Sequence, residues 1–488
     1  MRLMLTIGFN MTRMSDDYAN LTELLNQVVT ATGDFHKSLS DRPVGARKWD
    51  VVSDIELPAQ GVGSSEALRE FLARHGANLS GSVGPRFLGY VTGGTTPAAM
   101  AGDWLAAAVD QNAASPGDSA AVAVAVQTLD WLKQLFNLPV DAFDGAFTTG
   151  ATGANFASLL IAREWAGEQV GYDIAKRGMA GAPPIAIYSA CPHSSFVKVT
   201  RYLGLGENAI RPVARLAETE AMDPTSLEKL LSAAPSGEQK IVCASAGTVT
   251  TNAFDDLVAL SSICKRHNAW LHVDGAFGLF ARTVPELADR TSGIERADSI
   301  TVDAHKWLNV PYDSGFYFTR RVDLIERATG ALPAYLDVEG KGLPHYVNRA
   351  LESSQRFRAL PIWMTLAAYG AAGVRDIVRR NCQQAKSLAD WIEASPAFEL
   401  LAPTTLNVVC FRAIPPAEQE DGDAWNRGFL KALNETGDVF MTPGAYAGKT
   451  GIRAAFSNWM TVQEDLDRVT NAMHTTARTF SARRQETE

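Results

Sequence analysis

The chain has 488 residues, of which 46% are hydrophobic and 20% charged, so it can bury a substantial core and is long enough for two or three domains. Its net charge of −9 at pH 7 and its pI near 5.5 disfavour a nucleic-acid or anionic-membrane binder, because such proteins usually present a basic face. We therefore expect neither nucleic acid nor a membrane among its partners.

Cysteine usage and the N-terminus predict a cytoplasmic protein. The five cysteines are scattered without C-x-x-C spacing, so neither a disulfide framework nor a metal site is expected. The apolar start, residues 1–9, lacks a full signal-peptide core and cleavage pattern, and no run reaches the ~18 apolar residues that span a bilayer. Met1, Met11 and Met14 all remain open as the natural start.

Helical and strand-like patterns change along the chain. Residues 15–80 have amphipathic helical spacing, interrupted by a Gly/Ser-rich break at 61–65. From about 86 to 375, strands alternate with helices, which is the pattern of a parallel α/β layer. A small C-terminal α/β domain is predicted by strand-like 406–412 and 451–456 and by helical 424–436 and 463–478.

A turn rich in small residues runs into an amphipathic helix at residues 146–165. Gly150 and Gly153 let the backbone approach a ligand closely, and the first N–H groups of the helix, with the Thr152 hydroxyl, can cradle a phosphate dianion. The alternative is an ordinary glycine-rich turn capped by threonine. The stretch matches neither the G-x-G-x-x-G fingerprint nor a P-loop.

Two further strands end in polar turns. The apolar run at 185–190 leads to His193, whose flat imidazole suits stacking on a cofactor ring and proton exchange, or a hydrogen-bonded structural role. The run at 241–246 leads to Thr248, which is placed to hydrogen-bond a cofactor.

The segments 271–276 and 302–307 pair an aspartate, Asp274, with a lysine, Lys306, at the ends of two predicted strands. Pyridoxal phosphate needs a lysine amine to hold it as a Schiff base and a carboxylate to keep its pyridine nitrogen protonated. Considered alone, Asp274 is equally consistent with a strand terminus or a helix cap, and Lys306 is consistent with an ordinary surface residue. Their occurrence with the other three turns favours a pyridoxal phosphate site.

Together these segments resemble the group II pyridoxal-phosphate decarboxylases, which include aromatic-L-amino-acid, histidine, tyrosine and glutamate decarboxylases. The resemblance runs from about 85–90 to 456–459, and His305-Lys306-Trp307 with its upstream aspartate is a specific signature. It implies an α/β protein of the type I, aspartate aminotransferase-like fold, which assembles as a homodimer with shared active sites. The implied parts are residues 1–85 packing on the partner subunit, 86–375 binding the cofactor, and 376–488 as the small domain.

The resemblance also implies the residues of the site. Lys306, Tyr335, His193 and Asp274 are the expected catalytic residues. The cofactor is expected to contact Ala151, Thr152, Gly153, His193, Thr248, Asp274, Ala276, His305, Lys306 and Ser354. The substrate is expected to contact Tyr90, Val91 and Thr92.

A mobile catalytic loop is expected at about 328–346, where glycine, proline and charge leave little apolar surface to hold the segment in place. Tyr335 in this loop matches the family's tyrosine that protonates the carbanion left after carbon dioxide departs. A merely structural tyrosine is the alternative.

The expected reaction is decarboxylation of an L-amino acid to its amine. The substrate displaces Lys306 from the cofactor, the carboxylate leaves as its charge disperses into a ring kept protonated by Asp274, and Tyr335 supplies the proton. An aromatic substrate is the first choice, because residues 87–92 resemble the family's aromatic pocket wall. Ser354 narrows the expected site and favours a phenolic or imidazole side chain over an indole.

Other functions stay open. These are decarboxylation of a non-aromatic amino acid such as glutamate or diaminobutyrate, an aminotransferase that uses Arg453 for a second carboxylate, and an aldehyde synthase. The last class is expected to carry phenylalanine where this chain has Tyr335. A catalytically inactive cofactor-binding protein is disfavoured by the intact Lys306, Asp274 and His193.

Overall fold

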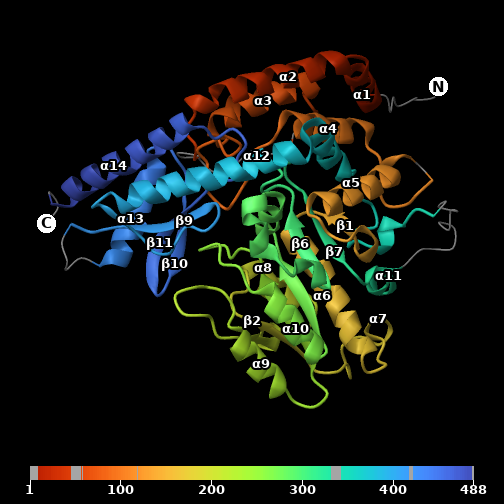
Figure 1. The fold of residues 1–488 in the computed structure, drawn as a ribbon. Coiled ribbons are helices and arrows are strands. Elements are labelled where there is room, and N and C mark those ends of the chain that lie inside the picture. Colours follow the sequence, from red (N-terminus) through yellow and green to blue (C-terminus); the bar gives the residue numbers. More distant parts are fainter. Residues whose placement is uncertain are drawn as a thin grey trace, which may run out of the picture.

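The computed structural model describes residues 9–45, 57, 59–117, 119–330, 342–416 and 421–485. Its N-terminal part is helical, with α1 (Phe9–Ala19), α2 (Leu21–Lys37) and α3 (Ser64–His75) lying together along one side of the molecule (Figure 1). Helix α3 begins within the predicted Gly/Ser break. None of the α2 residues is buried in the chain, so the apolar face that its spacing predicts is left uncovered.

A seven-stranded sheet forms the centre of the molecule, in the order β1-β7-β6-β5-β4-β2-β3. The strands are β1 (Asp144–Thr148), β2 (Ile185–Ser189), β3 (Ile210–Pro212), β4 (Gln239–Ser245), β5 (Ala269–Asp274), β6 (Ser299–Asp303) and β7 (Gly315–Thr319). The pairings from β3 to β6 are parallel, and β7 is antiparallel to both of its neighbours. Parallel strands end at the same edge, so the turns after β2, β4, β5 and β6 meet there.

Helices cover both faces of this sheet, which is why its strands read as almost continuous apolar runs. The helices are α4 (Pro97–Val109), α5 (Ala121–Leu135), α6 (Ala151–Glu168), α7 (Ile174–Arg177), α8 (Ser194–Tyr202), α9 (Pro224–Ser232), α10 (Leu257–Arg266) and α11 (Val322–Thr329). The N-terminus of α6 directly follows β1 and therefore lies at the edge of the sheet.

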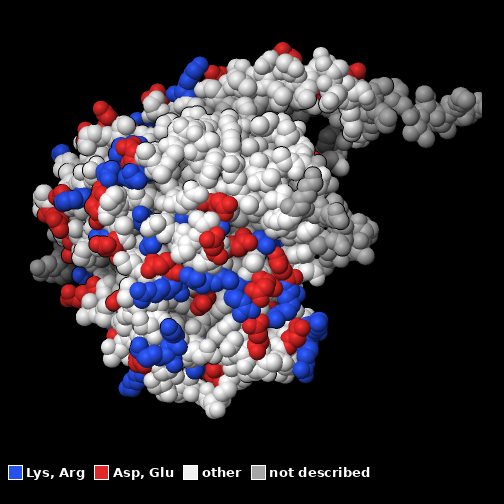
Figure 2. Space-filling model, turned by 45° about the vertical axis from the view of Figure 1, so that its right-hand side comes forward, with Lys and Arg blue, Asp and Glu red and all other residues white. Residues whose placement is uncertain are grey.

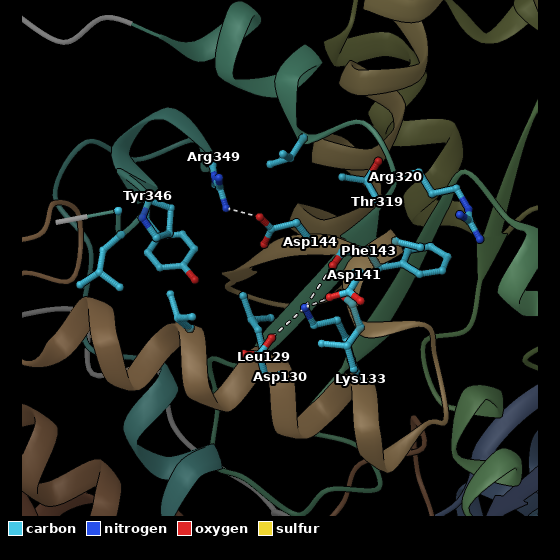
Figure 3. A pocket seen from close by; sticks show the side chains of 17 residues that line it. Leu129, Asp130, Lys133, Asp141, Phe143, Asp144, Thr319, Arg320, Tyr346 and Arg349 are labelled. Atoms are coloured by element: carbon cyan, nitrogen blue, oxygen red, sulfur yellow. Dashed lines mark hydrogen bonds and ion pairs between the residues drawn. The ribbon is translucent and has the colours of Figure 1, made fainter. Parts of the chain in front are cut away.

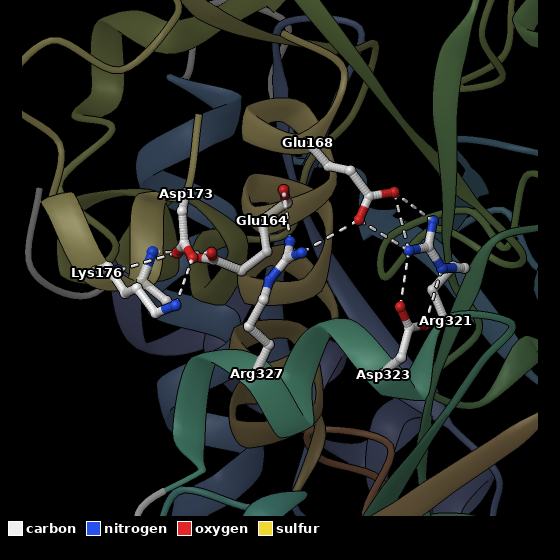
Figure 4. Close-up of polar contacts among 8 residues, drawn as sticks. Glu164, Glu168, Asp173, Lys176, Arg321, Asp323 and Arg327 are labelled. Carbon is white, nitrogen blue, oxygen red and sulfur yellow. Dashed lines mark hydrogen bonds and ion pairs between the residues drawn. The ribbon is translucent and has the colours of Figure 1, made fainter. Parts of the chain in front are cut away.

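Ion pairs join the C-terminal end of α6 to α11 (Figure 4). Glu168 pairs with Arg321 at 3.0 Å and with Arg327 at 3.3 Å, and Arg321 also pairs with Asp323 at 2.8 Å. The hydrogen bonds that Arg321 donates to Asp323 and Glu168 raise the pKa of its guanidinium. Since these side chains are about one-third exposed or more, the pairs orient α6 more than they stabilise it.

The C-terminal part contains a four-stranded antiparallel sheet, in the order β10-β11-β9-β8. Its strands are β8 (Phe398–Leu400), β9 (Val408–Ala413), β10 (Thr442–Tyr446) and β11 (Lys449–Ala455), packed with α13 (Gly422–Glu435) and α14 (Gln463–Gln485). Strands β9 and β11 and both helices lie where the sequence pattern predicts them. The 35-residue helix α12 (Ala359–Glu393) crosses from the large sheet to this smaller one.

A short N-terminal segment joins the smaller core. Leu88 donates its N–H to the Phe440 carbonyl at 2.8 Å and accepts the N–H of Ala455 at 2.9 Å, and its side chain is buried in the C-terminal core. Phe87 stacks on Phe440 with ring centroids 4.7 Å apart. The predicted boundaries at residues 86 and 376 assign Leu88 to the large domain. They therefore do not account for its pairing with the C-terminal core.

The described residues show no helix with both the length and the apolar character needed to cross a bilayer. The five cysteines, Cys191, Cys243, Cys264, Cys382 and Cys410, are all free. Within the same residues, no three His, Cys, Asp or Glu side chains are grouped so that they can hold a metal ion.

Candidate active site

A cavity of about 340 Å³ opens where β2, β4, β5 and β6 end. It brings together side chains from five separate segments of the sequence. Of the residues expected to hold the cofactor, those that line it are Ala151, Thr152, His193, Thr248, Asp274, Ala276, His305 and Lys306. The meeting of these segments follows from the parallel strand order, which aligns the polar turns at one edge of the sheet.

Lys306 lies in the turn after β6 and is paired with a carboxylate. Its Nζ is 3.0 Å from Asp303 Oδ2, and Nε2 of His305 is 3.6 Å from the same oxygen. Asp303 is 3% exposed and also accepts the N–H of Ala151 at the start of α6. The sequence interpretation missed Asp303, although it stands three residues before Lys306 at the end of the same strand.

Asp274 is the last residue of β5 and stands on another wall of the cavity. Its Oδ1 accepts a hydrogen bond from the backbone N–H of Ala276 at 3.1 Å, and its Oδ2 accepts one from the side-chain amide of Asn155 at 3.3 Å. A carboxylate that receives two N–H donors is held in one orientation. The sequence interpretation did not include Asn155, which follows Ala151 by four residues and so lies on the same side of α6.

The start of the 18-residue helix α6 forms one end of the cavity. Gly150 has φ of +153°, and a Cβ there would lie 3.0 Å from Cε1 of His305. Next to it, Nδ1 of His305 is buried without a hydrogen-bond partner among the described residues. The Ala151 N–H is engaged by Asp303, and the other N–H groups of the first turn, the positive dipole end of α6 and the unused ring nitrogen are the features of an anion site.

Gly153 lies in the first turn of α6 but does not line the cavity. A Cβ at this position would approach the Thr148 Cβ to 3.2 Å, so its small size serves the packing of α6 against the end of β1.

His193 caps the N-terminus of α8 while its ring borders the cavity. Its Nδ1 accepts the backbone N–H of Ser195 at 3.2 Å, so a neutral ring carries its proton on Nε2. Desolvation by its surroundings lowers the pKa of His193, which favours this neutral form.

Thr248 lines the cavity, but its hydroxyl is engaged elsewhere. It donates to Glu220 Oε2 at 2.6 Å and accepts the N–H of Ala253 at 3.0 Å. The sequence predicts that Thr248 hydrogen-bonds the cofactor. In the structure the Thr248 hydroxyl donates its proton to the charged Glu220 carboxylate, so that proton is already engaged. Glu220 lies in an irregular segment, and no sequence pattern pointed to it.

The residues expected to contact the substrate lie beside the cavity without lining it. The Tyr90 side chain is 61% exposed and packs against Phe87 and Phe440, with ring centroids 6.3 and 6.1 Å away. Val91 is buried in the large core, so its side chain is not available to a ligand. The hydroxyl groups of Thr92 and Tyr312 are 2.8 Å apart.

Ser354 is not among the residues that line the cavity. The Ser354 side chain is exposed. Tyr335 falls outside the described residues, within 331–341.

A second cavity, of about 690 Å³, lies between α5 and the strands β1 and β7 (Figure 3). Its cations already have partners: Lys133 Nζ is 2.8 Å from Asp130, and Arg349 is 2.7 Å from Asp144. It includes none of the residues that the sequence singled out, and it offers no comparable set of groups for catalysis.

The first cavity fits pyridoxal phosphate. It has an amine on Lys306, a fixed carboxylate on Asp274, and an anion site at the start of α6 that includes the unpartnered His305 Nδ1. The fold and this donor set together define a type I pyridoxal-phosphate enzyme.

The chain belongs to the pyridoxal-dependent decarboxylases, since residues 77–414 match the model of the pyridoxal-dependent decarboxylase conserved domain. It is therefore a carboxy-lyase that uses pyridoxal phosphate, and the predicted family, fold, enzyme class and cofactor are confirmed.

Similar proteins cover nearly the whole chain. Tyrosine decarboxylase 2 of Arabidopsis thaliana is 31% identical, over 89% of this chain and 83% of its own length. Tryptophan decarboxylase 1 of Oryza sativa subsp. japonica is 30% identical, over 88% of each chain. The crystal structure of the Oryza sativa enzyme TDC with PLP and tryptamine superposes with a TM-score of 0.88 at 26% identity, over 95% of this chain and 98% of that one.

Proposed function

We propose that this protein removes the α-carboxyl group of an aromatic L-amino acid and releases the corresponding amine. The observation that carries the proposal is the cavity in which Lys306, Asp274 and the start of α6 converge. Bound pyridoxal phosphate supplies an electron sink for the pair left behind when carbon dioxide departs.

The residues of the cavity have separate tasks. Lys306 would hold the cofactor through its side-chain amine. Asp274 keeps the proton on the ring nitrogen, and the start of α6 with His305 holds the phosphate. His193 presents Nε2–H at the cavity, which suits a ring that stacks on the cofactor and donates a hydrogen bond. Tyr335 is assigned to proton delivery at the α-carbon.

The names of the relatives support an aromatic substrate. Two of them, at 30% and 31% identity, are tryptophan and tyrosine decarboxylases. Tyr90 forms an aromatic cluster with Phe87 and Phe440, and its exposed ring is available to a substrate ring.

An aldehyde synthase is the second candidate, because phenylacetaldehyde synthase of Arabidopsis thaliana is 27% identical, over 92% of this chain and 94% of its own. Such an enzyme shares the cofactor cavity and differs in the group that protonates the α-carbon. The tyrosine at position 335 favours amine formation.

The product assay separates these functions. The purified protein is supplied with single L-amino acids, and carbon dioxide, amine, aldehyde and ammonia are measured separately. We expect carbon dioxide and amine in equal amounts, with tyrosine or tryptophan as the best substrate. Aldehyde with ammonia and oxygen uptake indicates the synthase, and keto acid without carbon dioxide rules out both.

A cytoplasmic homodimer with shared active sites is the proposed assembly. Helices α1 and α2 expose Met14, Tyr18, Leu25 and Val29, and Figure 2 shows a broad face without charged side chains below these helices. An uncharged face next to these exposed apolar side chains favours a protein partner. Sedimentation checks the proposal: the full chain is expected to be a dimer, and an active monomer contradicts it.

The five cysteines are free, which suits a reducing compartment and supports the proposed cytoplasmic location.

A further inference from the structure

Asp274 stands at the end of a continuous line of buried hydrogen bonds. Trp270 Nε1 is 3.0 Å from Ser299 Oγ, which is 2.9 Å from His272 Nδ1. His272 Nε2 is 3.0 Å from Asn155 Oδ1, and the Asn155 amide nitrogen is 3.3 Å from Asp274 Oδ2. Trp270 is 2% exposed, and Ser299, His272 and Asn155 are 0% exposed. We call these four residues the Asp274 relay.

The two ends of the relay set its direction. The Asp274 carboxylate only accepts, so Asn155 must turn its amide N–H₂ toward it and its oxygen toward His272. His272 must then carry a proton on Nε2. At the other end, the Trp270 indole only donates, so the Ser299 hydroxyl accepts from it and donates to the free Nδ1 of His272. Each donor thus points toward Asp274.

The imidazole must be neutral for this arrangement, because a second proton on Nδ1 would leave the Ser299 hydroxyl proton without its acceptor. Complete burial lowers the pKa of His272 to about 4, and only the charge of Asp274 opposes this shift. Between pH 5 and pH 9 the relay therefore keeps one protonation state and one direction.

We propose that His272, acting through Asn155, is a positioning residue that holds the Asp274 carboxylate as an acceptor for the ring nitrogen of pyridoxal phosphate. The inference rests on the role given to Asp274 in the proposed function. Among the described residues each carboxylate oxygen has one donor, the Asn155 amide on Oδ2 and the N–H of Ala276 on Oδ1. The carboxylate is thus fixed in orientation, with capacity left for a donor on the cofactor.

A pair of cofactors tests the inference through binding alone. Cofactor-free protein is titrated with pyridoxal 5′-phosphate and with its 1-deaza analogue, in which C–H replaces the ring nitrogen. Both share the phosphate and the aldehyde, so the ratio of their affinities isolates the contact with Asp274. A variant that only loosens the fold lowers both affinities and leaves the ratio unchanged.

Four variants define the expected result. His272→Phe removes both links of the ring and should lower the preference for pyridoxal phosphate about tenfold, the effect of one charge-assisted hydrogen bond. His272→Asn is milder: it can still accept from Ser299 but is too short to reach Asn155, and the same loss is expected. His272→Gln has an amide N–H at the distance of Nε2 and should keep the wild-type ratio. Ser158→Ala, a buried site on α6 whose hydroxyl has no partner among the described residues, is the control.

Asp274→Asn separates the two levels of the argument. If it abolishes the preference while both His272→Phe and His272→Asn keep it, the relay inference is overturned and the role of Asp274 stands. If Asp274→Asn itself keeps the wild-type ratio, the role of Asp274 in the proposed function fails, and the inference fails with it. Equal losses of affinity for both cofactors in the His272 variants also overturn the inference.

Discussion

Asp274 ends β5 and Lys306 lies in the turn after the neighbouring parallel strand β6, and the chemistry of the site depends on how closely other backbone segments approach them. The tightest approach is made by Gly93, whose N–H donates to the His305 carbonyl at 3.2 Å. A Cβ on Gly93 would lie 1.9 Å from the Lys306 carbonyl oxygen. The position of Lys306 therefore depends on the absence of a side chain at Gly93, which lies more than two hundred residues earlier in the sequence.

Lys306 should be the site of covalent attachment. Borohydride reduction of the holoenzyme, followed by peptide mapping, should find pyridoxyl phosphate on Lys306. Lys306→Ala should lose this label and about 10³-fold or more in kcat. A label on another lysine would contradict the assignment.

Gly93→Ala should displace the turn that carries Lys306, because backbone atoms cannot yield as a flexible side chain does. We expect kcat/KM to fall about 10²-fold, the effect of misplacing a reacting group by about 1 Å. Gly76→Ala is the control, since its nearest new contact is an ordinary 3.9 Å to Leu72. Equal activity of the two variants would show that the turn tolerates the shift.

The alternation of side chains along a strand identifies one more residue near the site than the sequence interpretation named. Residues 270, 272 and 274 lie on one face of β5, so His272 was predictable as a neighbour of Asp274. The partner of Thr248 was not predictable, because Glu220 comes from an irregular segment that only the folded chain brings close. Val91 was misplaced for a similar reason: its neighbours in sequence are near the site, but its own side chain packs into the core.

At the scale of elements, Asn309 fixes the turn that carries Lys306 to two segments that are distant in the sequence, one at Gly94 and one at residues 457–459. Its Oδ1 accepts the N–H of Gly94 at 2.8 Å and of Trp459 at 3.0 Å. Its Nδ2 donates to the carbonyls of Trp307 at 2.9 Å and Ser457 at 3.0 Å. All its hydrogen-bonding capacity is used, so the turn after β6 is rigid where the cofactor lysine needs it.

Helix α12 contains a break at Gly370, where φ is +60° and ψ is −173°. This region is accessible to glycine alone, and nothing lies within 4 Å of a Cβ built there, so a substitution tests the backbone without a clash. Gly370→Ala should destabilise the protein by about 1–3 kcal/mol in urea unfolding. Gly370→Asn should cost as much, because the left-handed conformation that asparagine tolerates has a different ψ. Wild-type stability of Gly370→Ala would show that α12 can straighten.

At the scale of the whole molecule, buried ionisable groups make stability depend on pH. The folded-state pKa of His272, about 4, lies below the value of roughly 6.5 expected in the unfolded chain. The stability linked to His272 is therefore fully present above about pH 6.5 and is lost as the pH falls toward 4. Burial raises the pKa of Asp255 to about 6, which acts in the opposite sense, so the His272 contribution must be measured as a difference.

We expect wild type to lose about 2 kcal/mol more stability than His272→Gln when the pH is lowered from 7.5 to 5.0. Glutamine does not titrate, and Asp255 is common to both proteins and cancels. Urea unfolding of both at the two pH values gives the comparison. An equal loss in the two proteins would mean that folding leaves the pKa of His272 unchanged.

The pairing of Leu88 with the last strand also has a consequence for the newly made chain. Arg86 bonds to the carbonyl of Asp438, 352 positions later, and Leu88 pairs with Ala455. At roughly 5–20 residues per second, a ribosome adds this length in roughly 20–70 s. During that time the segment around Leu88 is already outside the ribosome while its partner strands do not yet exist. The C-terminal core thus closes only after strand β11 has been made, and until then the apolar side chain of Leu88 has no partner strand to cover it.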